Sequence, residues 1–440
     1  MSAPALRRPW FEAADLCDVF SDTTTVVAPG GGSLVPVRLG SSPEGGWTLF
    51  RDGRPYIVRG AGGDGHLELL KQLGGTTIRT WGIEQLEQRV GGKTLLDRCH
   101  ELGLTIMAGI WLEHERHGFD YNDHEQVCRQ REAVRAAVRR YKDHPAILVW
   151  GLGNEMEGPN GDGAVPHVWR ELEVLAGIVK EEDPDHPICT VIAGFAAGKI
   201  QALMRDYTSL DILGVNAYGA AADAARGLTE AGWHKPFILG EYGPVGHWEV
   251  ALTDWGAPIE PPAREKARNY LAAHLASATE NQGRCVGTFA FIWGQKQETT
   301  ATWYGMFLAS GEKLPAVDAV SYAWNGVWPT HRSPHIEHVE ADFALRMVSP
   351  GSRLQASAVI VGAEPHALRL DWQVVAESTD RKQGGDPESA PPSQPECVTF
   401  NGKPRVEITA PLQPGAYRLF LYVRDGRGGA STENIPFFVR

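Results

Sequence analysis

Short apolar segments alternate with stretches of helical length from about residue 47 to residue 330, and this alternation constrains the fold more than any other feature. The apolar segments predict strands, because nearly continuous apolar runs are typical of strands covered on both faces. The eight strand candidates span 55–63, 76–82, 104–112, 147–155, 188–194, 211–218, 236–243 and 287–294. The clearest helix candidates between them span 91–103, 124–145, 167–184 and 264–283. Eight strand–helix units over this length predict a (β/α)8 TIM barrel.

A doubly wound open sheet is the alternative, but such sheets usually have fewer strands and a phosphate-binding glycine loop. The segment GAGGDG at 60–65 is the candidate for such a loop. No GK[ST] follows it, so we interpret it as a tight turn after the first strand.

The pattern changes after about residue 330, where the helical period ends and short alternating runs are separated by Gly and Pro turns. We therefore predict three parts: a lead-in over residues 1–46 that packs on the barrel, the barrel over 47–330, and a C-terminal all-β immunoglobulin-like sandwich over 331–440. The polar, Pro-rich segment 378–396 is expected to be a mobile loop. We expect the sandwich to buttress the barrel rather than to bind a glycan.

Charge and hydropathy narrow the classes of partner. The net charge of −12 argues against nucleic acid, which needs a basic surface. No apolar run is long enough to predict a membrane span. The first residues lack the apolar core of a signal peptide, so we expect a cytoplasmic protein as the sequence is written, or a periplasmic or secreted one if a leader has been removed. No CxxC pair occurs, which disfavours a zinc ribbon.

Polar residues follow the predicted strands at their carboxyl ends, where barrel enzymes carry their chemistry. Glu155 and Glu241 come directly after the fourth and seventh apolar runs. A glutamate in such a place is costly to desolvate unless it is paired or useful. Two carboxylates facing each other across a barrel mouth could supply the proton donor and the nucleophile or base of glycosidic cleavage. The alternative is that both are structural, with salt bridges to Arg79 and to surface Lys or Arg.

Other strand ends carry residues that are suited to contact sugars. We expect Arg79, Trp81, Glu113, His114, Asn154, Asn216, Tyr218, Trp293, Gln295 and Trp303 to bind substrate. Indole and phenol rings can stack on the CH faces of pyranose rings, while amides and charged groups reach hydroxyls.

The pattern as a whole resembles the clan A retaining β-glycosidases. It consists of Asn-Glu after the fourth strand, Glu-Tyr-Gly after the seventh, Arg after the second and Trp after the eighth. The barrel of glycoside hydrolase family 2 is the nearest match over about residues 50–330, and the wall-remodelling β-glucanosyltransferases look similar too. The resemblance implies that Glu155 is the acid/base and Glu241 the nucleophile, about 5–5.5 Å apart as retention requires.

The resemblance also implies roles for the surrounding residues. Asn154 matches the asparagine that binds the sugar 2-hydroxyl, Arg79 the arginine that keeps the nucleophile charged, and Tyr218 a residue near the nucleophile. Trp293 matches the aromatic floor under the sugar that is attacked. Two features depart from family 2: few residues precede the barrel here, and Trp81-Gly82 stands where a Ser-His-like stretch is usual. These departures leave the substrate and the subfamily open.

Two further clusters have alternative interpretations. The loop 113–125 is rich in His and acids, but it lacks the HExxH frame, so we expect a polar loop in which Glu113 or His114 touches sugar hydroxyls rather than a metal site. The loop 293–307 either forms sugar subsites or packs on the C-terminal sandwich. Glu157 and Glu249 are expected to be loop acids exposed to solvent.

The sequence therefore predicts a retaining glycoside hydrolase that acts on a β-linked glucan or oligosaccharide with no cofactor. Three alternatives remain. A transglycosylase would use the same residues with a sugar acceptor. A non-catalytic carbohydrate-binding barrel would need one glutamate to face away, and a metal-dependent hydrolase would use the histidines of 113–125.

Overall fold

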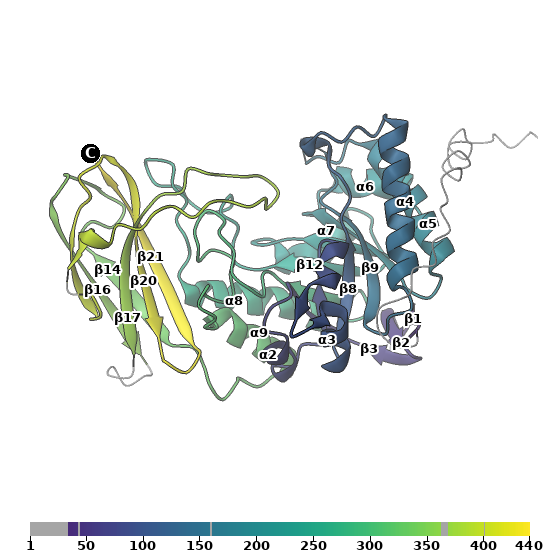
Figure 1. Ribbon diagram of the computed structural model, residues 1–440, viewed down its shortest axis with the longest axis horizontal. Helices are drawn as coiled ribbons and strands as arrows, with labels where there is room; N and C mark the ends of the chain where they lie inside the picture. Colours follow the sequence, from purple (N-terminus) through teal and green to yellow (C-terminus); the bar gives the residue numbers. More distant parts are fainter. Residues whose placement is uncertain (1–33, 43–44, 159–160, 362–367, 400) are drawn as a thin grey trace, which may run out of the picture.

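The computed structural model describes residues 34–42, 45–158, 161–361, 368–399 and 401–440. These residues form a small N-terminal sheet, a closed barrel and a β-sandwich that lies beside the barrel (Figure 1). Most of the predicted lead-in lies outside the described residues. No helix in the described ranges has the length and apolar character needed to cross a membrane.

Parallel strands close the barrel in the order β10-β11-β12-β13-β4-β5-β8-β9. Their bounds are β4 (Val58–Gly62), β5 (Thr77–Arg79), β8 (Thr105–Ile110), β9 (Ile147–Asn154), β10 (Ile188–Ala193), β11 (Ile212–Asn216), β12 (Phe237–Tyr242) and β13 (Cys285–Ala290). The closed ring confirms the predicted TIM barrel and excludes the open sheet. The eighth strand differs most from its predicted range, because it ends at Ala290 and the last residues of that apolar run leave the sheet.

Helices cover the outside of the ring. They are α2 (Leu67–Gln72), α3 (Leu95–Glu101), α4 (His124–Tyr141), α5 (Pro166–Glu182), α6 (Ala197–Asp206), α7 (Ala224–Glu230), α8 (Ala263–His274) and α9 (Pro315–Asn325). Local signals set their ends: the Asp123 side chain caps α4 by accepting from the amides of Glu125 and Gln126. Pro315 opens α9, and Gly326 at φ 71° ends it.

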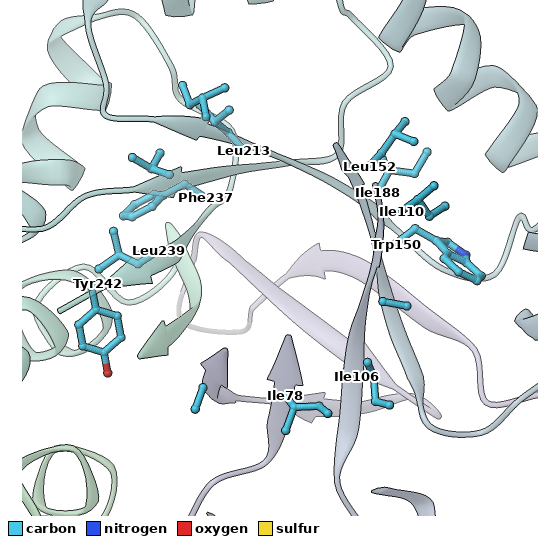
Figure 2. Close-up of a cluster of buried hydrophobic side chains, with 14 of the residues drawn as sticks. Ile78, Ile106, Ile110, Trp150, Leu152, Ile188, Leu213, Phe237, Leu239 and Tyr242 are labelled. Atoms are coloured by element: carbon cyan, nitrogen blue, oxygen red, sulfur yellow. The ribbon is translucent and has the colours of Figure 1, made fainter. Parts of the chain in front are cut away.

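Two apolar layers hold the barrel together. Side chains on the outer faces of the strands, such as Ile106, Trp150 and Phe237, pack against the helices; Figure 2 shows them pointing away from the centre of the ring. A second cluster fills the inside and includes Met107 and Ile238. A three-stranded sheet closes the bottom of this inner cluster with Val37 and Leu49. Its strands are β1 (Val37–Ser41), β2 (Trp47–Arg51) and β3 (Arg54–Tyr56).

The C-terminal part is an all-β sandwich, as predicted. One sheet has the order β14-β16-β19-β18 and the other β15-β21-β20-β17. The bounds are β14 (His335–Ala341), β15 (Met347–Val348), β16 (Arg353–Val361), β17 (Arg369–Ala376), β18 (Val398–Thr399), β19 (Arg405–Thr409), β20 (Gly415–Arg424) and β21 (Ala430–Val439). The inner faces of the two sheets share one apolar core, which includes Trp372, Val406 and Phe437.

The sandwich is bonded directly to the barrel. Arg418 of β20 is buried and donates through Nη2 to the carbonyl of Pro258, 2.5 Å away. The amide of Ala430 donates to the carbonyl of Lys313, and the amide of Lys313 donates to the carbonyl of Gly428. These contacts fix the sandwich next to the mouth of the barrel.

Candidate active site

The carboxyl ends of the barrel strands surround a cavity of about 870 Å³. Its size is within the range of pockets that hold small ligands. Glu155 and Glu241 both line it, and so do Trp81, Asn216 and Tyr218. The two glutamates singled out in the sequence therefore face one shared space.

Glu241 is held by donors on both carboxylate oxygens. Arg79 Nη1 lies 2.9 Å and Trp81 Nε1 3.1 Å from Oε1, while the Tyr218 hydroxyl lies 2.7 Å from Oε2. Burial and the neighbouring Glu241 hold the pKa of Tyr218 well above its usual value, so its hydroxyl remains a donor. These contacts fix the orientation of the carboxylate and balance its charge.

Arg79 connects this carboxylate to the end of the fourth barrel strand. The guanidinium is buried, and its Nη2 donates to Asn154 Oδ1 at 2.6 Å. Its Nη1 also donates to the carbonyl of Gly240 at 2.8 Å. A carboxylate and two carbonyl oxygens accept from the buried guanidinium, which offsets the cost of its desolvation.

Glu155 reaches the cavity through a turn at the end of β9. Gly153 and Glu155 have φ values of 74° and 52°, and the amide of Glu155 donates to the carbonyl of Val191. Left-handed backbone suits Gly153 but is unusual for a glutamate. The turn brings the side chain to Asn216, whose Nδ2 donates to Glu155 Oε1 at 2.8 Å.

The two carboxyls thus have different surroundings. Burial raises the pKa of Glu155 to about 7, with smaller contributions from the negative charges of Glu241 and Glu157. Glu155 can therefore carry a proton near neutral pH, while Glu241 sits beside a guanidinium. Two carboxyls in contrasting environments are the arrangement that separates an acid from a nucleophile.

Glu157 is buried, and the prediction of an exposed loop acid was wrong. Its side chain accepts from Lys199 Nζ at 3.2 Å and from the amide of Ala193. The chain turns inward after Glu155, and this brings Glu157 against α6 instead of into solvent. Glu157 is thereby a fixed acidic neighbour of Glu155.

The loop after β8 contributes a different residue from the two expected. His114 is buried, and its Nε2 donates to the carbonyl of Asn154 at 2.8 Å. Burial lowers the pKa of His114 to about 4, so the ring is neutral and supports the backbone next to Glu155. Glu113 is exposed and does not line the cavity, whereas Trp111 does.

Among the described residues, no group of three or more His, Cys, Asp or Glu could hold a metal ion.

The aromatic residue of the eighth strand end is also different from the expected one. Trp293 is 1% exposed and packs between Phe307 and Trp324, so it cannot stack on a sugar. Phe291 lines the cavity instead, because β13 ends at Ala290 and Phe291 is the first residue past it.

Two other expected subsite residues lie outside the cavity. Trp303 is 1% exposed and donates through Nε1 to the carbonyl of Val245, which places it in the wall. Gln295 does not line the cavity, and its Nε2 lies 3.5 Å from the carbonyl of Ala301. The later residues Lys296 and Glu298 of the same loop do line it.

Sequence reasoning missed two parts of the cavity. Trp248 lines it with 60% of its surface exposed, and its neighbour in a Gly-rich loop, Glu249, orders that loop by accepting from the amides of Gly219 and Gly246. The second part comes from the sandwich, whose residues 382–387 line the cavity. The tryptophan could have been noticed as an aromatic after the seventh strand, whereas the sandwich residues carry no local signal.

Comparison with known proteins agrees with the site. The family model "Glycosyl hydrolases family 2, TIM barrel domain" matches residues 92–247, a range that contains both glutamates. Mannan endo-1,4-beta-mannosidase F of Aspergillus clavatus is 24% identical over 177 residues, which cover 31% of this chain and 40% of that protein. The match therefore spans well under two thirds of that relative.

Two solved structures are similar at low sequence identity. A Bacteroides uniformis beta-glucuronidase is 13% identical, with 89% of this chain and 47% of that chain covered and a TM-score of 0.48. A glycoside hydrolase family 5 mannosidase from Rhizomucor miehei is 13% identical, with 63% and 94% covered and a TM-score of 0.43. The family match confirms the resemblance predicted from the strand ends: residues 92–247 of this barrel are similar to the TIM-barrel domain of glycoside hydrolase family 2.

Proposed function

We propose that this protein is a retaining glycoside hydrolase that cleaves a β-linked glycoside with Glu155 and Glu241. The observation that carries the proposal is the pair of carboxyls on one cavity, one with a pKa of about 7 and the other bonded to Arg79, Trp81 and Tyr218. A non-catalytic binding barrel would need one glutamate to face away, and neither does.

The reaction proceeds in two displacements. Glu155 gives its proton to the glycosidic oxygen as the bond from that oxygen to the anomeric carbon breaks. The Glu241 carboxylate attacks the same carbon and forms an ester with the sugar. Glu155 then takes a proton from water, whose oxygen displaces Glu241 and restores both residues.

The neighbouring residues position these groups. Arg79 and Tyr218 hold Glu241 in line with the carbon that it attacks, and Asn216 holds the Glu155 carboxyl toward the cavity. Asn154 also lines the cavity and is fixed by Arg79, which suits it to bind the sugar 2-hydroxyl. Phe291 offers the apolar ring on which the attacked sugar rests.

The charges of the cavity favour a neutral sugar. Lys296 lies 2.7 Å from Glu298 and Lys382 lies 2.9 Å from Asp380, so both lysines that line the cavity have carboxylate partners. The remaining ionised lining groups are acidic, and a uronic acid would meet no free cation among the described lining residues. A β-linked glucan or mannan fragment is the class that we propose, since the matched relative is named a mannan endo-1,4-beta-mannosidase.

The test is a screen of aryl β-glycosides of mannose, glucose, galactose and glucuronic acid, together with β-1,4-linked manno- and gluco-oligosaccharides. We expect a neutral sugar to be the best substrate. Glu241→Gly should lose on the order of 10⁴-fold or more in kcat. Azide should restore turnover by entering the vacated face and giving the α-glycosyl azide.

The matched variant at the other carboxyl should behave differently. Glu155→Ala with azide should give the β-glycosyl azide, because the ester on Glu241 still forms. Glu230→Gln, on the exposed end of α7, serves as the control and should keep full activity. The two-glutamate mechanism would be ruled out if Glu241→Gly turned over at the native rate. It would also be ruled out if both variants gave the glycosyl azide of the same anomeric configuration.

A further inference from the structure

A loop of the sandwich lies at the mouth of the barrel cavity. It leaves β17 at Glu377 and enters the other sheet of the sandwich at β18, and in Figure 1 this yellow-green segment extends from the sandwich toward the barrel. Residues 382–387 line the cavity that contains Glu155 and Glu241. The sandwich therefore does more than buttress the barrel.

The loop is held in shape by its own contacts. Asp380 Oδ2 accepts from the amide and the hydroxyl of Ser389, both at 2.9 Å. The amide of Lys382 donates to Glu388 Oε1 at 3.2 Å. These bonds tie the two sides of the loop together at its base, and residues 383–386 project beyond them as a tip. The expectation that 378–396 is simply a mobile loop overlooked this set of bonds.

The loop contacts two separate loops of the barrel. On one side Lys296 Nζ donates to the carbonyl of Gly385 at 2.9 Å, and the amide of Thr299 donates to Glu388 Oε2 at 2.7 Å. Both partners follow β13. On the other side Asp386 Oδ2 lies 3.1 Å from His117 Nε2, which follows β8.

The positions of β13 and β8 in the ring show which part of the mouth the tip spans. Between them lie only β4 and β5. The chain after β4 is short, since α2 begins at Leu67. The tip thus bridges the arc from β13 to β8, which includes this short connection.

The bridged arc lies on one side of the bond to be cleaved. Trp81 comes from the end of β5 and Phe291 follows β13, and both line the cavity next to Glu241. The sugar that becomes attached to Glu241 must lie beside them. Glu155 follows β9 and Glu241 lies in β12, so both are outside the arc, but Glu241 is bonded to Arg79 and Trp81 of the arc whereas Glu155 is bonded to Asn216 of β11. The leaving group must lie on the side of Glu155. The loop therefore stands beyond the transferred sugar, where a longer chain would continue.

From this arrangement we infer that the loop 380–389 closes the cavity beyond the transferred sugar, so that the enzyme removes sugars one at a time from the non-reducing end of a chain. The inference rests on the proposed function. It assigns the sandwich a part in specificity, with Gln383, Gly385 and Asp386 as the residues that block the path of a longer glycone.

The test is the product pattern of a hexasaccharide of the preferred linkage that carries a label at its reducing end. The native enzyme should first release a labelled pentasaccharide, and shorter labelled products should follow in order. Early labelled di- or trisaccharide from the native enzyme would overturn the inference and leave the proposed function intact. A total lack of hydrolysis on all substrates would instead remove the proposed function.

A shortened loop tests the cause. The variant has residues 383–386 replaced by Gly-Gly. It can still form the hydrogen bonds at the foot of the loop, from Ser389 to Asp380 and from Lys382 to Glu388. We expect internal cleavage to appear, and kcat/KM on the hexasaccharide to rise about tenfold relative to an aryl glycoside. A pattern that stays sequential in this variant, with the near-UV circular dichroism retained, would overturn the inference.

A single substitution keeps the test valid if the shortened loop disturbs folding. Asp386→Ala removes the contact with His117 and should give a smaller shift toward internal products. Leu412→Ala, on an exposed turn between β19 and β20, is the control and should leave the product pattern unchanged. Equal losses on the aryl glycoside and the hexasaccharide in Asp386→Ala, with no change of pattern, would indicate a merely structural role for the loop.

Discussion

Hydrogen bonds from three side chains distinguish Glu241 from Glu155, whose pKa is raised mainly by burial. The Tyr218 hydroxyl donates to Glu241 Oε2, the oxygen that Arg79 and Trp81 leave free. A charge-assisted bond of this kind is worth about 1.5–3 kcal/mol. Its strength also changes during the reaction, because the carboxylate becomes a neutral ester and then a carboxylate again.

We therefore expect Tyr218→Phe to lower kcat about 10- to 100-fold with a smaller change in KM, measured on an aryl glycoside. Tyr304→Phe is the matched comparison, since the Tyr304 hydroxyl bonds to His247 and not to a glutamate. It should lose much less. If the two variants lose kcat equally, the bond to Glu241 is not the cause.

The raised pKa of Glu155 leads to a prediction about stability. The folded pKa of about 7 lies above the ordinary value of 4.5, so folding favours the protonated form. The stability tied to that form is fully present below pH 4.5 and is lost as the pH rises through 7. Glu155→Gln cannot ionise, so it should raise the Tm at pH 8 and have little effect at pH 4.5.

Thermal unfolding at the two pH values, with Glu230→Gln as the control, checks this pH dependence. The control should show the same Tm difference from the native protein at both values, because Glu230 is exposed on α7. A gain for Glu155→Gln that is equal at pH 4.5 and 8 would mean that ionisation of Glu155 does not limit stability.

The sequence predicted only some of the residues that line the cavity at the strand ends. Asn154, Glu155 and Glu241 follow apolar runs directly, so their place at the mouth could be inferred. Phe291 is inside such a run and gave no signal, because the strand ends before the apolar residues do. Trp293 was chosen for its ring, although two more residues past the strand were enough to turn it back into the core.

At the scale of the element, the end of β9 depends on one glycine. Gly153 has a φ of 74°, and a Cβ there would lie 3.0 Å from Met156 Cγ and 3.2 Å from Leu112 Cδ1. Gly153→Ala should lower the free energy of unfolding by about 1–3 kcal/mol and reduce kcat, because Glu155 would shift with the turn.

Gly177→Ala provides the contrast within a helix. A Cβ at Gly177 meets nothing within 4 Å, and the residue lies inside α5. This variant should gain about 0.5–1 kcal/mol of stability at unchanged kcat. Urea unfolding and kcat measured on both variants compare the two sites. If Gly153→Ala loses stability but keeps its kcat, the conformation of this turn does not determine the position of Glu155.

Element prediction was best where burial enforces a pattern. The barrel strands are buried on both faces, and their apolar runs locate them closely. Short helices such as Leu67–Gln72 and Ala224–Glu230 were missed, because six or seven residues are too few to show a helical period. Their existence follows from the need to connect neighbouring parallel strands.

At the scale of the whole molecule, the cavity is shared between two parts of the chain. The bond from Lys296 to Gly385 joins residues 89 positions apart, and that from His117 to Asp386 joins residues 269 apart. No periodicity or motif in either segment encodes this meeting. It depends on how the sandwich docks on the barrel, which the sequence alone did not specify.

Arg418 is the residue that best tests this docking. It is 1% exposed, and besides the carbonyl of Pro258 it binds Glu377 through Nε at 2.7 Å and Asn434 through Nη1 at 2.9 Å. Glu377 begins the segment that carries the loop 380–389. Arg418→Met would leave the partly buried Glu377 with only Arg381, whose Nη2 lies 3.1 Å from Glu377 Oε1, at a cost of about 1–3 kcal/mol. We expect a lower urea midpoint together with more internal cleavage of the labelled hexasaccharide, because the loop loses its anchor.

The control is Arg369→Met, at an exposed position of β17. Its free energy of unfolding should stay within about 0.5 kcal/mol of that of the native protein, and its product pattern should be unchanged. If Arg418→Met lowers the midpoint but leaves the product pattern unchanged, the position of the loop does not depend on this anchor and must be set by the contacts of its tip with the barrel.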